Sequence, residues 1–328
     1  MKKFSKSYQE IISLENLLLA WKEFLAGKSR RRDVALFQGR LMDNIQKLRE
    51  ELAIKTYYHD PYQAFNISDP KPRNIHKATV RDRLLHHLLY RETYTYFDRR
   101  FIADSFSCRL EKGTHRAIYR FRADAHRASR NGRHTAWILK GDIRKFFASI
   151  DHEVLKGLLA KYIEDQDLLW LFGRVIDSFA TSGRPGVGLP LGNLTSQLLV
   201  NVYLNEFDQF VKRTLRIKYY IRYADDFLIL SSDREDLVGL LSKLVRFLES
   251  ELKLSLHPKK VSLKTLTSGS DFLGWVEFGD HRVIRTVTKK RMIKKISASP
   301  HPVTLASYKG MLKHGDSYKL RQSLNLLD

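Results

Sequence analysis

The chain has 328 residues, of which 43% are hydrophobic and 29% charged, and this balance excludes an intrinsically disordered protein. Its 58 Lys and Arg residues outnumber its 36 Asp and Glu residues, which gives a formal net charge of +22. Because this excess is spread along the chain, it favours a protein that follows a long polyanion and argues against a small ligand pocket as the main binding site.

The first half of the chain is predicted to be mainly helical. Residues 7–54 carry apolar side chains at spacings of three and four, which is typical of amphipathic helices. Residues 64–76 are expected to be extended and interrupted by Pro70 and Pro72, which suits a hairpin. A helix from about residue 78 to residue 96 is expected to follow.

The next elements are predicted to alternate between strand, helix and loop. The apolar run over residues 135–143 indicates a buried strand that ends in an acid, and residues 151–163 are expected to be helical. Residues 181–190 hold three Gly and two Pro and therefore predict a loop. Asn193 or Thr195 is expected to cap the helix that follows.

The last part of the chain begins with a predicted hairpin. Two short runs rich in β-branched and aromatic residues flank residues 223–226, which indicates strand, tight turn, strand. Residues 232–235 form a capping-box pattern before an amphipathic helix. From about residue 288 the chain becomes basic again, and short helices are expected there.

Three acids form the candidate catalytic site. Asp225 and Asp226 lie at the tip of the predicted hairpin, and Asp142 ends the buried strand. Crowded carboxylates repel one another, and a divalent cation is the usual compensation. Taken alone, the pair could be a solvated turn and Asp142 a helix cap. Taken together, the three acids could hold two Mg²⁺ ions for in-line phosphoryl displacement.

These segments resemble the palm of a reverse transcriptase. Residues 138–147 are similar to the first catalytic motif and residues 223–226, Tyr-Ala-Asp-Asp, to the second. Between them, residues 188–197 resemble the segment that touches template and incoming nucleotide. Residues 271–275 resemble the primer grip. Upstream, two further stretches resemble finger motifs, residues 71–75 and 104–109.

The resemblance implies an α+β right-hand polymerase fold with fingers, a palm built on an antiparallel sheet, and a short helical thumb. We expect an N-terminal helical extension over residues 1–60, fingers over 61–134, palm over 135–287 and thumb over 288–328. The implied activity is RNA-directed DNA polymerase, using two Mg²⁺ ions, or Mn²⁺ in their place.

The resemblance also implies roles for individual residues. Asp142 and Asp225 would bind both metals, Asp226 would support them, and the carbonyl of Ile143 would complete one shell. Lys260 matches a lysine thought to protonate the leaving pyrophosphate, with Lys259 as its rival. The remaining expected contacts are Lys71, Arg73, Arg109, Phe147 and Leu191 for the nucleotide, and Gly192, Ser196, Gln197, Tyr223, Phe272, Leu273 and Gly274 for template and primer.

Two of these positions have a specific physical reading. Phe147 matches a steric gate whose ring would clash with a 2′-hydroxyl and so favour dNTPs, although aromatic pairs such as Phe146 and Phe147 also commonly pack in cores. A Gln at position 191 could hydrogen-bond the nascent pair, whereas Leu191 offers only apolar contact. Losing that bond would change selectivity by roughly 1 kcal/mol. The alternative is neutral replacement at a buried position.

Within the family, the chain resembles the reverse transcriptases of diversity-generating retroelements. Related group II intron and retron enzymes usually carry Gln where this chain has Leu191, and Ser-Pro where it has Ser196-Gln197. This resemblance implies frequent misinsertion opposite template adenine. The rival functions are a reverse transcriptase of antiviral or intron-derived lineage, a nonenzymatic RNA-binding module that kept the fold, and a templated polymerase of another class.

The expected partners are template RNA, a DNA or RNA primer, dNTPs and, by resemblance, a small basic accessory protein. The single residue Cys108 excludes an internal disulfide and a cysteine-based zinc site. No apolar stretch approaches the roughly 20 residues that span a bilayer, and no signal-type apolar core follows the basic start. We therefore expect a cytoplasmic protein with no membrane partner.

Overall fold

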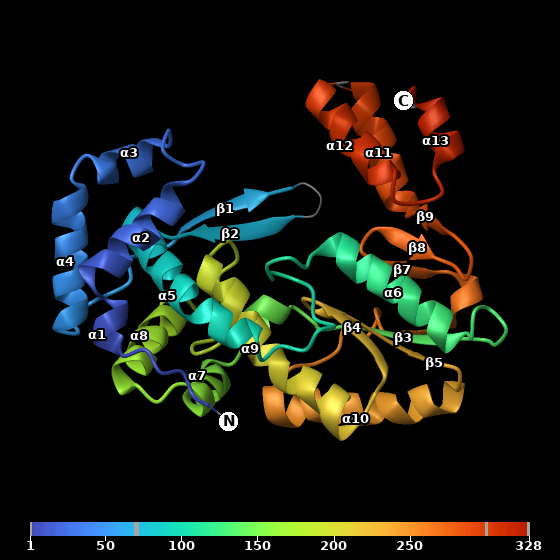
Figure 1. Cartoon of the computed structure of the whole chain (residues 1–328), viewed down its shortest axis with the longest axis horizontal. Coiled ribbons are helices and arrows are strands. Elements are labelled where there is room, and N and C mark those ends of the chain that lie inside the picture. The colour runs from blue at the N-terminus through green and yellow to red at the C-terminus, as the bar shows by residue number, and fades with distance from the viewer. Residues whose placement is uncertain (1, 69–71, 299–300, 327–328) are drawn as a thin grey trace. The chain divides into compact units, whose positions relative to one another are not determined.

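The computed structural model describes residues 2–68, 72–298 and 301–326. The chain divides into two compact units, each assembled from segments that are distant in the sequence. Unit 1 comprises Met1–Ala103, Ile143–Leu215 and Val245–Ser255, and unit 2 comprises Asp104–Asp142, Arg216–Leu244 and Leu256–Asp328. The predicted mixture of helices and antiparallel sheet is confirmed (Figure 1). The four subdomain boundaries given above stay a prediction.

Unit 1 is mainly helical, and α5 (Val80–Asp98) is its central helix. The side chain of Thr79 caps α5 by accepting a hydrogen bond from the amide of Asp82. Apolar residues on several sides of α5 are buried because α1, α2, α3 and α9 all contact this helix. The other helices are α1 (Tyr8–Ile11), α2 (Leu14–Leu25), α3 (Arg32–Gln38), α4 (Leu41–Ala53), α7 (His152–Tyr162), α8 (Gln166–Asp177), α9 (Leu194–Gln209), 3₁₀ η1 (Phe146–Ser149) and π-helical η2 (Phe210–Thr214).

The predicted hairpin in unit 1 is confirmed. β1 (Gln63–Ile67) pairs antiparallel with β2 (Arg73–Lys77), so that Phe65 lies opposite Ile75. Pro70 lies outside the described residues. The predicted loop at residues 181–190 contains no helix or strand, only two isolated bridges, one between Thr181 and Arg184 and one from Val187 to Asp151.

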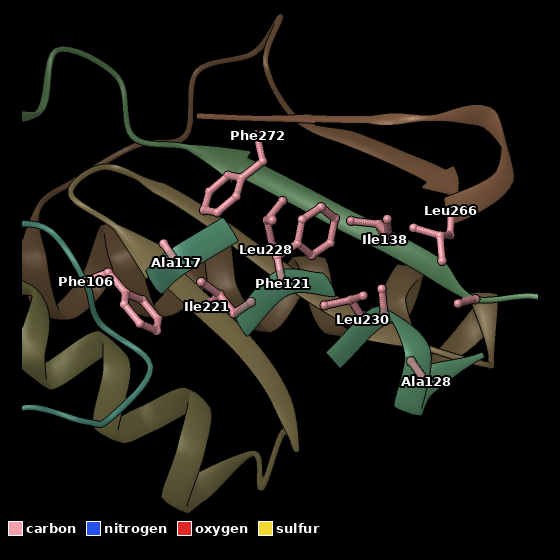
Figure 2. Close-up of a cluster of buried hydrophobic side chains, with 12 residues drawn as sticks. Phe106, Ala117, Phe121, Ala128, Ile138, Ile221, Leu228, Leu230, Leu266 and Phe272 are labelled. Carbon is pink, nitrogen blue, oxygen red and sulfur yellow. The ribbon is translucent and has the colours of Figure 1, made fainter. Parts of the chain in front are cut away.

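Unit 2 is built on a four-stranded antiparallel sheet in the order β4-β5-β3-β6. The strands are β3 (Trp137–Asp142), β4 (Tyr219–Tyr223), β5 (Asp226–Ser231) and β6 (Ser262–Thr265). Helix α6 (Thr114–Ala128) packs against β4 and β5. Figure 2 shows apolar side chains of α6, including Phe121, meeting Ile138, Leu228 and Leu230 of the strands in one core.

The C-terminal part of unit 2 combines a small sheet with three helices. The sheet runs β7 (Ser270–Phe272), β8 (Trp275–Glu277) and β9 (Arg282–Ile284), and a 3₁₀ turn, η3 (Leu266–Ser268), precedes it. The helices are α11 (Thr286–Ala298), α12 (Pro302–Leu312) and α13 (Tyr318–Ser323), as the basic C-terminal segment predicts. Trp275 and Ile284 of the sheet share a core with Met292 and Leu312.

Two predicted helix starts differ from the observed ones in their capping atoms. Helix α10 (Arg234–Leu252) is capped by Asp233, whose Oδ1 accepts the amide of Glu235 at 2.8 Å, and not by Ser232 as the capping-box pattern predicts. Asn193 occupies the N-cap position of α9 but makes no side-chain cap; its Nδ2 donates to the carbonyl of His76. Across the described ranges, no helix is long and apolar enough to cross a membrane.

Candidate active site

Two carboxylates lie directly opposite each other at one end of the unit 2 sheet. Asp142 is the last residue of β3, Asp226 is the first residue of β5, and the two are paired in the antiparallel register. Directly opposed residues of an antiparallel pair project to the same face, with Cβ atoms roughly 5 Å apart. Asp142 is only 5% exposed, and Asp226 is half-buried. The structure therefore brings together two of the three predicted acids.

A glycine in β3 permits this close pairing. Gly141 lies opposite Phe227, and a Cβ added to Gly141 would meet Cζ of the Phe227 ring at 2.2 Å. The ring occupies the space that any other residue would fill. The close packing of Gly141 against Phe227 thus holds β3 and β5 together next to Asp142 and Asp226.

The third acid lies in the turn of the β4–β5 hairpin. Tyr223 and Asp226 are paired at the strand ends, so Ala224 and Asp225 form the turn. Ala224 has a φ of 53°, in the left-handed region that non-glycine residues rarely adopt. Such a conformation costs of order 1 kcal/mol and persists only where neighbouring contacts hold it.

Arg222 provides such contacts, although no sequence motif indicates it. Its side chain is 1% exposed; Nη1 donates to the carbonyl of Ala224 at 3.1 Å and Nη2 to Oγ of Ser105 at 3.0 Å. Backbone hydrogen bonds also link Arg222 to Asp104 and Phe106, so this predicted finger motif runs beside β4. The position of Arg222 as a charged residue within an otherwise apolar strand is the sequence feature that could have indicated this role.

Lys260 contacts Asp142, one of the three predicted acids. Its Nζ donates to both Oδ1 and Oδ2 of Asp142 at 2.9 Å, and this hydrogen bond is the main reason that the pKa of Lys260 is raised. The loop that carries it is anchored by the amide of His257, which donates to the Asp142 carbonyl at 2.7 Å. The side chain of its sequence rival, Lys259, has no partner within the described ranges. The structure thus distinguishes the two adjacent lysines.

The electrostatics of this rim favour a cation. The pKa of Asp226 is raised to about 6, first by burial and then by the negative charges of Asp225 and Asp142, while Lys140 and Lys260 oppose the rise. Lys140 lies two residues before Asp142 in β3 and therefore on the same face of the sheet. Two ammonium groups thus already offset three crowded carboxylates.

Carboxylate oxygens suit Mg²⁺ and similar hard cations, so the chemistry of this donor set fits a divalent metal. Side-chain placement does not yet form a coordination shell. In the part of the chain that the structure describes, no three His, Cys, Asp or Glu residues are grouped so as to hold a metal ion. Both oxygens of Asp142 are instead hydrogen-bonded to Lys260. Metal binding by these acids requires Lys260 to share or release Asp142.

The predicted primer-grip residues lie at the end of β7, where Phe272 is paired with Trp275, and in the turn to β8. Leu273 and Gly274 have φ values of 51° and 90°, so both adopt the left-handed region that a tight turn needs. Phe272 is 1% exposed and packs edge-on against Phe121 with ring centroids 5.7 Å apart. The Phe272 ring therefore belongs to the core, and the side chain of Leu273 also packs against two hydrophobic clusters, so it is the backbone of Leu273 and Gly274 that forms the tip of the turn.

Lys140 connects this hairpin to β3, the strand that ends in Asp142. Its Nζ donates to the carbonyl of Asp271 at 2.7 Å, while its backbone belongs to β3. Two other predicted residues of unit 2 are held by local contacts. The hydroxyl of Tyr223 lies 3.2 Å from that of Thr114, and Nη1 of Arg109 donates to the carbonyl of Ser105 at 2.9 Å.

The remaining predicted residues belong to unit 1, where two groups of them meet. The carbonyl of Leu191 accepts the amide of His76 in β2 at 3.0 Å. Gly192 has a φ of 106°, and a Cβ there would lie 2.8 Å from Cγ2 of Ile75. The segment at residues 191–192 thus docks closely on the strand that begins at Arg73, which is exposed.

The other predicted positions in unit 1 differ in how deeply they are buried. Phe147 is half-buried, whereas its neighbour Phe146 is 3% exposed, so only Phe147 retains accessible ring surface. Ser196 is buried and Gln197 half-buried in the first turn of α9. Ile143 directly follows β3 and its side chain is buried, while Lys71 lies outside the described residues.

Comparisons with known proteins agree with this architecture. A family model described as reverse transcriptase (RNA-dependent DNA polymerase) matches residues 68–276. Protein YkfC of Escherichia coli (strain K12) is 26% identical over 308 residues, which cover 81% of this chain and 77% of YkfC. The group II intron-encoded protein LtrA of Lactococcus lactis subsp. cremoris is 23% identical over 76% of this chain, which spans about half, 51%, of LtrA.

Solved structures show the same fold at lower sequence identity. Apo telomerase from Candida tropicalis, truncated from its C-terminal domain, aligns with a TM-score of 0.52 and 10% identity. The alignment covers 72% of this chain and 59% of the telomerase chain. At this identity the likeness concerns the fold alone.

Proposed function

The chain belongs to the reverse transcriptase family, and we propose that it copies RNA into DNA at the rim formed by Asp142, Asp225 and Asp226. Family membership supports RNA-directed DNA polymerase activity in general. The observation that supports placing the activity at these residues is the direct pairing of Asp142 with Asp226 across β3 and β5, with Lys260 donating to both oxygens of Asp142.

The acids would bind a divalent metal, Mg²⁺ or Mn²⁺. When bound, such ions lower the pKa of a primer 3′-hydroxyl and neutralise charge on the leaving pyrophosphate. The protein's own contribution is positional: the sheet fixes Asp142 and Asp226, and Arg222 holds the turn that carries Asp225. Lys260, released from Asp142, would supply a proton to the departing pyrophosphate.

Other residues would orient the substrates. The accessible ring of Phe147 would contact the incoming sugar and exclude a 2′-hydroxyl, which favours dNTPs. Leu273 and Gly274, at the tip of the β7–β8 turn, would support the primer end. Arg73, on the exposed edge of β2, would contact phosphate. Positioning and electrostatics of this kind carry most of the rate in phosphoryl transfer.

The test is primer extension on an RNA template with Mg²⁺ and four dNTPs. Asp142→Asn should abolish extension while RNA binding, measured by filter retention, stays near wild type. The matched control is Asp43→Asn, which makes the same change at an exposed position of α4. Extension by Asp142→Asn at the wild-type rate would refute the assignment of the site.

We further propose that the enzyme is of the diversity-generating retroelement type and inserts errors opposite template adenine. The support is the sequence at Leu191 and at Ser196-Gln197, and the position of Leu191 beside β2. An accessory protein, small and basic, would assist template binding. Sequencing of the cDNA should show errors concentrated at adenines, and Leu191→Gln should lower their frequency several-fold.

The second candidate is an accurate reverse transcriptase of intron-derived lineage, which the similarity to LtrA favours. This candidate predicts an error spectrum without preference for adenine and no effect of Leu191→Gln on fidelity. The same cDNA sequencing therefore separates the two functions. Loss of extension in Asp142→Asn is common to both.

A further inference from the structure

Unit 1 contains a basic cavity that none of the roles above uses. It has a volume of about 320 Å³. Four cationic side chains and two hydroxyls line it: Arg144, Lys145, Ser149, Arg184, Lys253 and Ser255. We refer to it as the basic cavity. No acidic residue is among its lining residues.

Most of this positive charge is uncompensated. The side chains of Arg144, Lys145 and Arg184 are exposed and make no hydrogen bond or ion pair with any residue in the described ranges. Lys253 alone has an acidic partner, since its Nζ lies 2.8 Å from Oδ2 of Asp151. Like charges gathered in one concavity repel one another, and a bound anion relieves that repulsion.

Backbone hydrogen bonds hold two of the three lining segments in place. The amide of Arg144 donates to the carbonyl of Ser255 at 2.9 Å, which joins the segment after β3 to the segment after α10. Oγ of Ser149 donates to the carbonyl of Arg144 at 3.3 Å. Lys145 has a φ of 47°, and this left-handed turn aims the chain into η1.

The third segment is the glycine-rich loop that contains Arg184. The amide of Arg184 donates to the carbonyl of Thr181 at 2.8 Å, which closes a tight turn. The loop is attached to η1 because Oγ1 of Thr181 donates to the carbonyl of Ala148 at 3.1 Å. Hydrogen bonds to the backbone therefore hold all three of the segments that carry the lining residues.

We propose that the basic cavity binds a polyphosphate group, as in pyrophosphate or a nucleoside triphosphate. Three unpartnered cations around one cavity match the several charges that linked phosphates carry. A nucleic-acid strand presents only one charge per phosphate, spread along its length. Arg144 and Arg184 can each hold phosphate oxygens through a two-pronged guanidinium, and the hydroxyl of Ser255 adds a neutral donor.

The source of the polyphosphate rests on the proposed function. Polymerisation consumes nucleoside triphosphates and releases pyrophosphate, and Arg144 follows the catalytic Asp142 by two residues in the chain. The cavity would accordingly retain either the incoming triphosphate or the pyrophosphate product. Both share the same chemistry, and binding experiments can distinguish them.

The test is isothermal titration calorimetry of the full chain with sodium pyrophosphate in EDTA, where polymerisation cannot occur. The double variant Lys145→Gln/Arg184→Gln should bind pyrophosphate at least tenfold more weakly than wild type. The matched control removes the same two charges from the exposed face of α4, as Lys47→Gln/Arg49→Gln, and should bind like wild type. Equal affinities for all three proteins, or equal weakening in both variants, would overturn the proposal.

Two further titrations identify the source and the alternative. If dATP binding falls with pyrophosphate binding in the test variant, the cavity takes a nucleotide's triphosphate; if only pyrophosphate binding falls, it takes the free product. A single-stranded oligonucleotide without terminal phosphate is the third ligand. If its binding falls tenfold while pyrophosphate binding is unchanged, the cavity is a nucleic-acid backbone site and the polyphosphate proposal is wrong.

The result is separable from the proposed function. Repeating the titrations in the Asp142→Asn background should give the same affinities, because the basic cavity does not include the acids. Failure of primer extension together with intact pyrophosphate binding would contradict the polymerase assignment and leave the cavity assignment standing. Circular dichroism of each variant confirms that the chain has folded.

Discussion

Ionised Asp226 is expected to destabilise the folded protein, and Asp226→Asn should remove that cost. Its pKa is raised from the ordinary value of 3.8 to about 6, first by burial and then by Asp225 and Asp142. The folded state therefore keeps a proton that the unfolded state releases near pH 4. The contribution of Asp226 to the free energy of unfolding should fall as the pH rises between about 4 and 6 and then level off. The difference between the two pKa values corresponds to about 3 kcal/mol at pH 7.

Urea unfolding between pH 4.5 and 8, in EDTA, measures this effect. The free energy of unfolding of Asp226→Asn should exceed that of wild type by an amount that grows with pH and reaches about 3 kcal/mol at pH 7. The exposed Asp43→Asn variant controls for loss of a charge and should show no such trend. An advantage that is constant across pH, or a less stable Asp226→Asn at pH 7, would refute the reasoning.

Three further substitutions test the support of the site. Gly141→Ala should lower the free energy of unfolding by about 1–3 kcal/mol, because the new Cβ would meet the Phe227 ring. Urea unfolding measures this loss, and an unchanged free energy of unfolding would contradict the close packing of Gly141 against Phe227. Arg222→Met should lower the free energy of unfolding by roughly 3 kcal/mol and slow primer extension, because it removes the hydrogen bonds from Arg222 to Ala224 and Ser105. Arg222→Lys should restore only part of the lost stability and rate. Lys260→Met should reduce the rate of single-turnover extension about 10²-fold, and an unchanged rate would exclude Lys260 as the proton donor. The same change should cost only about 1 kcal/mol of stability, because the Lys260 side chain is 48% exposed.

The elements that hold the acids could be predicted from local sequence. An apolar run that ends in Asp142 has the pattern of a buried strand, and the Tyr-Ala-Asp-Asp segment between two apolar runs has the pattern of a hairpin. Both patterns depend on residues within ten positions of one another. The structure agrees with them, as β3 and the β4–β5 hairpin show.

The precise support of the acids depends on contacts that are distant in the sequence. The ring of Phe227 fills the space above Gly141, 86 residues earlier by their numbers, and no local pattern indicates such a pair. Lys259 and Lys260 are equivalent in a sequence motif. They differ in the structure because the loop is anchored at His257, which brings only Lys260 to Asp142.

The basic cavity shows the same limit for charge. In the sequence, Arg144, Arg184 and Lys253 lie in three separate segments, and each alone has the appearance of a solvated surface charge. Only the backbone hydrogen bonds between these segments show that the charges converge. A net charge of +22 indicates that the protein binds polyanions. It does not indicate where in the fold the cations lie close enough to repel one another. Because such a concentration costs folding energy unless an anion is bound, a preformed cavity with unpartnered cations is a stronger indication of a binding site than the total charge.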